Sequence, residues 1–115
     1  MTDSKDKNLR RDGFRNNKAG EFSFLESRTH VVFTLRQVVE NLDPVLFVIH
    51  DSDEADWQFL TGKPVLQKDL LLVSLESLVA TDHTLNELAD LPQGWYATRQ
   101  TNKSAWERKQ IIDWS

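Results

Sequence analysis

One short stretch concentrates the residues that could do chemistry: HDSDEAD, residues 50–56. It carries four carboxylates within six positions, directly after a histidine. Clustered carboxylates can hold a hard cation, serve as a pair of catalytic acids, or attract a basic partner. A histidine can add a metal ligand or transfer a proton. The spacing of these residues decides which of these roles the stretch can have.

Calcium binding is the first role that the spacing opposes. An EF-hand loop needs alternating acids, a glycine at its sixth position and a glutamate at its twelfth. Counted from Asp51, the fifth, sixth and twelfth residues are Ala55, Asp56 and Gly62. The pattern fails at each of these positions, so no calcium loop and no other metal site is predicted.

Catalysis would need groups that the sequence does not bring together. The other histidines are His30 and His83, and neither has a second histidine at ligand spacing. Paired carboxylates work in glycoside hydrolysis only across a cleft that keeps one of them protonated. We therefore predict no catalytic residue, no cofactor and a protein that is not an enzyme. The alternative is a small metal-dependent hydrolase that uses His50 and the carboxylates of residues 51–56.

A solvent-exposed turn that docks another protein is the functional role that we expect for these acids. Asp and Ser favour exposed turns because their side chains bond the nearby backbone. This preference alone would explain the acids if the segment were only a polar turn without a binding role. Tryptophan is enriched in binding hot spots, although the same residues can equally serve as core aromatics. The predicted protein-binding residues are Asp51, Asp53, Glu54, Asp56, Trp57 and Trp95.

Two β-rich runs must position this turn. Residues 45–50 (VLFVIH) are continuously apolar, as in a buried strand, and residues 57–61 (WQFLT) resume the pattern after the acids. Two such runs around a short polar segment predict a hairpin. A second hairpin is predicted from residues 94–100 and 105–112, because the four residues between them all favour turns.

The remaining segments predict two more strands and short helices. Residues 30–33 and 69–74 are strand candidates. Residues 34–43 carry apolar side chains at helical spacing and could be capped by Thr34. Most connections are short enough for hairpins, so we expect an α+β domain. Its mainly antiparallel sheet would have about five strands, with the short helices on one face.

Two further helix starts follow from capping residues. Ser74 is placed to cap a helix over residues 75–80. Thr84 and Glu87 match the Ser/Thr-x-x-Glu capping box, which predicts another short helix from this point.

The length and charge of the chain divide it into a tail and one domain. Its 115 residues, 39% of them hydrophobic, suffice for a single domain, which we assign to residues 21–115. Residues 1–20 contain six basic and three acidic side chains, and we expect a disordered or loosely attached basic tail. The acids interrupt this basic patch, so a nucleic-acid partner is not expected.

Several classes of protein are excluded by composition. The chain has no cysteine, which excludes disulfides, zinc–thiolate sites, iron–sulfur clusters and thiol catalysis and fits a cytoplasmic protein. No apolar run approaches the roughly 18 residues that a membrane span needs, so no membrane partner is expected.

Three stretches carry a resemblance to a known family. They are VLFVIHDSDEADWQFLTG (45–62), LLLVSLESLVATDHTLNELADLPQGWYATRQ (70–100) and AWER (105–108). They resemble a family of small bacterial domains of uncharacterised function, which is related to the immunity-protein-like domains of polymorphic toxin systems. The likeness covers about residues 30–109.

The resemblance implies a small cytoplasmic α+β domain that acts by binding another protein and has no catalytic residues. The W-x-F-x-x-G motif of the family falls on Trp57, Phe59 and Gly62, and its acidic turn falls on residues 51–56. An acidic surface would suit a basic toxin, such as a nuclease, as the partner.

Overall fold

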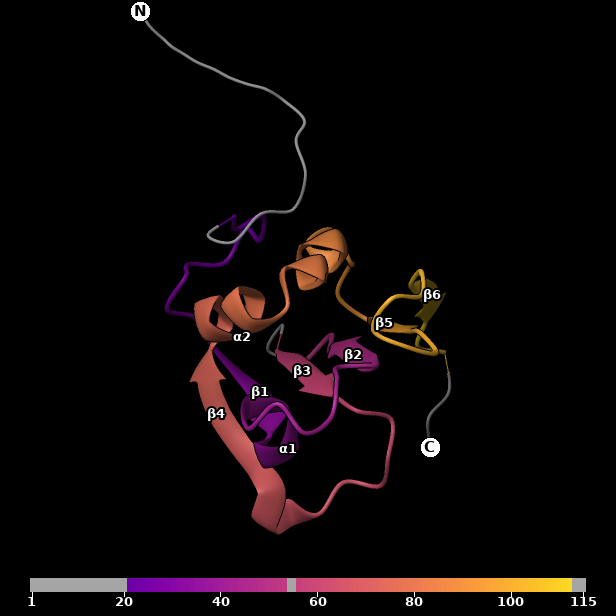
Figure 1. Ribbon diagram of the computed structural model, residues 1–115. Coiled ribbons are helices and arrows are strands. Elements are labelled where there is room, and N and C mark those ends of the chain that lie inside the picture. The colour runs from indigo at the N-terminus through magenta and orange to yellow at the C-terminus, as the bar shows by residue number, and fades with distance from the viewer. Residues whose placement is uncertain (1–20, 54–55, 113–115) are drawn as a thin grey trace, which may run out of the picture.

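The computed structural model describes residues 21–53 and 56–112, which form a six-stranded sheet (Figure 1). The strands are β1 (Val31–Leu35), β2 (Phe47–His50), β3 (Trp57–Leu60), β4 (Leu70–Ser74), β5 (Trp95–Thr98) and β6 (Glu107–Gln110). Their order across the sheet is β4-β1-β3-β2-β5-β6. β1 and β3 run parallel, and all other neighbours run antiparallel. The predicted mainly antiparallel α+β fold is therefore confirmed, with six strands instead of about five.

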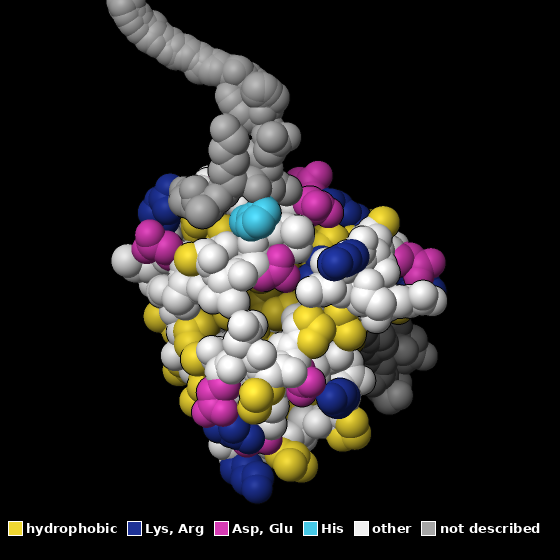
Figure 2. All heavy atoms as spheres, viewed as in Figure 1, with side chains coloured by type: hydrophobic (Ala, Val, Ile, Leu, Met, Phe, Trp, Pro, Cys, Tyr) yellow, Lys and Arg dark blue, Asp and Glu magenta, His cyan; other side chains and the backbone are white. Residues whose placement is uncertain are grey.

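Four short helices complete the domain. They are α1 (Arg36–Val39), α2 (Leu75–Thr81) and two 3-10 helices, η1 (Gln67–Asp69) and η2 (His83–Leu88). None of the helices in the described part of the chain is long and apolar enough to cross a membrane. On the face seen in Figure 2, acidic and basic side chains lie at several separate places among polar ones. The predicted basic tail, residues 1–20, lies outside the described residues.

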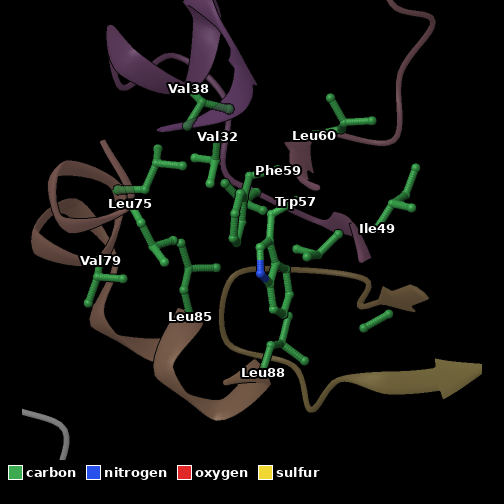
Figure 3. Packing of buried hydrophobic residues seen from close by; sticks show 14 of the residues in the cluster. Val32, Val38, Ile49, Trp57, Phe59, Leu60, Leu75, Val79, Leu85 and Leu88 are labelled. Carbon is green, nitrogen blue, oxygen red and sulfur yellow. The ribbon is translucent and has the colours of Figure 1, made fainter. Parts of the chain in front are cut away.

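The core lies between the sheet and the two longer helical segments. Trp57 and Phe59 of β3 project from the sheet toward Leu75, Leu85 and Leu88 of α2 and η2 (Figure 3). All five side chains are almost completely buried. Burial of side chains of this size stabilises a fold by about 1.5–3 kcal/mol each, so this layer contributes substantially to the stability of the domain. The helices that cover this face are the ones predicted around residues 75–89.

Both predicted hairpins are present. β2 and β3 pair from Phe47↔Leu60 to His50↔Trp57, which leaves the acidic residues in the connecting turn. β5 and β6 pair from Trp95↔Gln110 to Thr98↔Glu107. β2 also pairs with β5, so the two hairpins form one continuous antiparallel half of the sheet.

β1 takes both of its partners from distant parts of the chain. Phe33 lies opposite Leu72 of β4 on one side and Gln58 of β3 on the other. The fully buried Thr34 strengthens this position, because its hydroxyl donates to the Phe59 carbonyl oxygen at 2.8 Å. β1 thus joins the hairpin half of the sheet to the edge strand β4.

The predicted helix over residues 34–43 is present only as the single turn α1, and both its length and its predicted cap are wrong. Thr34 belongs to β1 and does not cap α1, which has no side-chain cap and ends after one turn. Asn41 then adopts a left-handed backbone with φ of 63°. Two members of the expected apolar stripe, Val39 and Leu42, are exposed. Pairing of β1 with two strands outweighed the weak local preference for helix.

One predicted cap is confirmed and the other is wrong. Ser74 caps α2, since its hydroxyl accepts from the Ser77 N–H at 3.2 Å. The expected capping box does not form, because Asp82 caps η2 and accepts from the Thr84 N–H at 3.1 Å. Glu87 instead lies exposed on η2.

Candidate functional site

The acidic turn is an ordered end of the β2–β3 hairpin as far as it is described. The Asp51 N–H donates to the Asp56 carbonyl oxygen at 2.8 Å, which closes the hairpin. Asp51 Oδ1 accepts from the Asp53 N–H at 2.9 Å, an Asx turn of the kind that these residues favour. Asp53 is exposed, whereas Asp51 and Asp56 are half-buried. Glu54 lies outside the described residues.

The described carboxylates of this turn differ from the other described aspartates, each of which forms an ion pair with a Lys or Arg side chain. The ion pairs of the other aspartates are Asp43–Lys63, Asp69–Arg36, Asp82–Arg99 and Asp90–Arg108. Asp51, Asp53 and Asp56 form no ion pair with any other described residue. These three carboxylates therefore have no close cation among the described residues, and their charges add up over one short turn.

Two of the paired aspartates show how the protein neutralises acids elsewhere. The hydrogen bond from Gln37 and the guanidinium of Arg36 lower the pKa of Asp69, and Asp69 in turn raises the pKa of Arg36. The hydrogen bond from Arg108 likewise lowers the pKa of Asp90. These carboxylates favour the charged form because donors face them. The described aspartates of the acidic turn have no such guanidinium partner among the described residues.

The start of β5 lies beside the acidic turn. Trp95 lies opposite His50 and is half-buried. A Cβ atom added to Gly94, whose φ is +85°, would lie 3.7 Å from the Ser52 Cβ, so this glycine abuts the acidic turn. The Gly94 carbonyl oxygen accepts from the N–H of residue 111 at 2.8 Å, and the next side chain, Ile112, is 86% exposed. The backbone at the start of β5 thus abuts the acidic turn, while the Trp95 side chain packs partly against the core.

Trp57 is not part of this exposed surface, which corrects the sequence-based assignment. Its side chain is 1% exposed and packs edge-on against Phe24, with ring centroids 5.2 Å apart. Its Nε1–H donates to Glu26 Oε2 at 2.9 Å. Trp57 therefore contributes to the core and holds a further carboxylate, that of Glu26, near the start of β3.

His50 lies in the core and does not face the solvent with the acids. Its ring stacks on Trp57 with centroids 3.8 Å apart, and the side chain is 7% exposed. Nδ1 lies 2.7 Å from the Leu91 carbonyl oxygen. Because a carbonyl only accepts, Nδ1 carries the proton, and Nε2 has no hydrogen-bond partner among the described residues. The position of the proton on the His50 ring thus follows from the hydrogen bond to Leu91 alone.

The alternative role as a metal-dependent hydrolase finds little support in this geometry. His50 is turned into the core, while the described carboxylates of residues 51–56 lie at the exposed turn. Within residues 21–53 and 56–112, no group of three or more His, Asp or Glu side chains is placed to hold a metal ion.

A buried arginine is the polar centre that the sequence did not reveal. The side chain of Arg99 is 1% exposed, and each of its three guanidinium nitrogens donates a hydrogen bond. It donates to the Val45 carbonyl oxygen at 3.1 Å, to Thr84 Oγ1 at 3.0 Å and to Asp82 Oδ2 at 2.8 Å. It also stacks 4.1 Å from the ring centroid of Trp106. Arg99 thereby ties together the starts of β2 and η2 and the β5–β6 connection.

A cleft of about 310 Å³ lies beside this arginine network, which places it near the lower end of ligand-pocket sizes. Its floor is formed by the apolar side chains of Val38, Val45, Leu78 and Leu85, and its rim carries Asn41, Asp43, Asp82, Asn102 and Lys103. Hydrophobic side chains are visible at the bottom of a hollow near the middle of the face in Figure 2. No spacing rule could have found this cleft, because its lining comes from three distant stretches of the chain, residues 38–45, 78–85 and 102–103.

Comparison of the chain with models of protein families, with curated proteins and with solved structures finds no match in any of the three. The resemblance to immunity-protein-like domains therefore stays a prediction, and the functional argument depends on the geometry of the site.

Proposed function

We propose that this protein is a non-enzymatic binding domain that docks a basic protein at the acidic turn. The observation that carries the proposal is the charge of this turn: Asp51, Asp53 and Asp56 have no cation among the described residues, whereas the other described aspartates do. An Arg or Lys of a partner could supply the missing cations. Complementary charge speeds encounter and orients the partner.

The surface beside the turn adds apolar area to this charge. Gly94 abuts the turn, half-buried Trp95 follows it in the chain, and exposed Ile112 follows residue 111, whose N–H donates to the Gly94 carbonyl oxygen. Binding surfaces combine an apolar centre with a charged rim in this way. The Asx turn also holds the Asp51 carboxylate in place before binding, so less conformational entropy is lost at this side chain when a partner docks. A basic toxin, which the resemblance implies, is one partner of this chemistry.

The experiment removes the charges without changing the shape of the turn. The full chain, immobilised through a tag, is used to capture proteins from a lysate of its source organism at low and at moderate salt. Partners are identified by mass spectrometry, and the purified partner is titrated by calorimetry. Asp51→Asn with Asp53→Asn should weaken binding by about tenfold or more, because two attractive charges are lost.

A matched variant separates the local effect from the change in net charge. Glu87→Gln with Glu107→Gln removes the same number of charges from exposed positions elsewhere, and its affinity should stay within about threefold of the wild type. A partner that binds both double variants equally well would contradict the proposal, as would the absence of any basic partner at either salt concentration.

A further inference from the structure

The two faces of the sheet are covered differently. The helices α2 and η2 lie on one side of the sheet (Figure 1), where Val32, Trp57 and Phe59 are buried. Side chains alternate between the two faces along a strand, so the neighbours of these residues point to the opposite face. On that face, β1 and β4 carry four apolar side chains that are between 37% and 62% exposed: Val31, Phe33, Leu70 and Leu72. We call these four side chains the β1–β4 face.

The β1–β4 face is apolar throughout. Leu72 lies directly opposite Phe33 on the neighbouring strand, and such side chains approach within about 5.5 Å of one another. Neither β1 nor β4 contains a charged residue. Adjoining exposed apolar side chains with a polar margin are typical of protein-binding surfaces.

Two carboxylates of the acidic turn point to the same side of the sheet. The hydrogen bond from the Asp51 N–H to the Asp56 carbonyl oxygen continues the β2–β3 ladder by one pair beyond His50 and Trp57. Because His50 and Trp57 face the core, the next pair along the hairpin faces the other way. Asp51 and Asp56 therefore share a side of the sheet with the β1–β4 face.

The parallel pairing of β1 with β3 brings these carboxylates next to the apolar side chains. Phe33 and Gln58 are directly paired. Two residues earlier along each parallel strand, Val31 comes beside Asp56, at the spacing of neighbouring strands of about 4.8 Å. Val31 is exposed and Asp56 is half-buried. The acidic turn thus forms one margin of the β1–β4 face.

We propose that the basic partner of the acidic turn covers the β1–β4 face with an apolar surface of its own. This inference rests on the proposed function and adds the side of the turn on which most of the contact lies. Charge complementarity selects the occupant: Asp51 and Asp56 have no cation among the described residues. Lysine or arginine side chains beside the partner's apolar surface would pair with these carboxylates while the apolar surfaces lose water.

Other occupants lack this complementary charge. A second copy of the chain brings no cation on the same face, because β1 and β4 contain no lysine or arginine, and it would add further carboxylates. A membrane with anionic lipids would be repelled by the acids at the margin. A protein with an apolar centre and basic side chains at its edge fits both parts of the surface.

The first test maps the contact with a photoreactive probe. The full chain carries benzoylphenylalanine in place of Leu72 and is irradiated in a lysate of its source organism. The matched control carries the same group in place of Leu42, which follows α1 and is 64% exposed, against 62% for Leu72. A basic protein should become linked at position 72 and not at position 42. Asp51→Asn with Asp56→Asn should reduce the linked product about tenfold or more.

The second test titrates the purified linked protein against variants by calorimetry. Leu72→Lys should raise the Kd about tenfold or more, because it removes an apolar contact and places a cation against a basic partner. Leu72→Glu should raise the Kd less, since glutamate attracts the same partner. Leu42→Lys should leave the Kd within about threefold of the wild type. Circular dichroism shows whether each variant is folded.

The outcomes separate this inference from the proposed function. A basic protein that binds through the acids, is not linked at position 72 and is insensitive to Leu72→Lys overturns the inference and leaves the proposed function standing. Linkage at position 72 to a second copy or to lipid overturns the inference as well. A partner that is linked there but binds equally well after loss of the acids contradicts both, as does the absence of any basic partner.

Discussion

Replacing Arg99 by methionine should lower the free energy of unfolding by about 3 kcal/mol. Methionine keeps most of the buried stem, so the loss comes from the guanidinium. The Val45 carbonyl oxygen becomes buried without its donor, which costs about 1–2 kcal/mol. The stacking on Trp106 contributes about 1 kcal/mol more. The Asp82 side chain is 25% exposed and regains water, so losing its cation adds only about 0.5–1 kcal/mol.

The assay is urea unfolding followed by tryptophan fluorescence. A domain of this size unfolds with a slope of about 1–1.5 kcal/mol per molar urea, so the midpoint should fall by about 2–3 M at unchanged slope. Arg108→Met is the matched control. Its guanidinium pairs with Asp90, whose side chain is 81% exposed, and such surface pairs contribute no more than about 1 kcal/mol.

A loss for Arg99→Met no greater than that for Arg108→Met would refute this reasoning. A double-mutant cycle with Asp82→Asn adds a second check. Because the two side chains are in direct contact at 2.8 Å, their coupling energy should reach about 1 kcal/mol. Additive effects would mean that the network does not act as a unit.

Two further predictions concern the stability of the β4 end of the domain. The lowered pKa of Asp69 means that its charged form stabilises the fold above the ordinary pKa of an aspartate, and that this contribution is lost as the pH falls through the folded-state pKa. Between about pH 5 and pH 2, the urea midpoint of the wild type should therefore fall more steeply than that of Asp69→Asn, and parallel curves would contradict this. Ser74→Ala, which removes the cap of α2, should cost about 1 kcal/mol in the same assay, whereas Ser27→Ala in an exposed loop should cost less than about 0.5 kcal/mol.

The local parts of the fold could be predicted from the sequence. The hairpin around residues 51–56 follows from two β-rich runs, and the cap at Ser74 follows from its position before an apolar helix. Each of these features depends on residues close together in the chain. The hairpin of β5 and β6 was recognisable for the same reason.

Features that depend on distant contacts could not be predicted in this way. The parallel pairing of β1 with β3 leaves no local signal, and it also converts Thr34 from an expected helix cap into a buried strand residue. Trp57 follows four acids in a turn, and only the position of Phe24 and Glu26 shows that it is buried. An arginine at position 99 would be expected at the surface from the sequence alone. It is buried because its partners, which lie far apart in the chain, surround it in the fold.

The place of β1 within the sheet has a consequence for synthesis on the ribosome. β1 precedes both of its partners, β3 and β4, in the order in which the chain is made. At roughly 5–20 residues per second, its apolar Val-Val-Phe-Thr-Leu sequence waits for seconds before either neighbour emerges. The hairpin of β2 and β3 can form locally in the meantime. Closure of the sheet around β1 can therefore begin only after residues 57–74 have emerged, and until then this apolar strand has neither of its sheet partners.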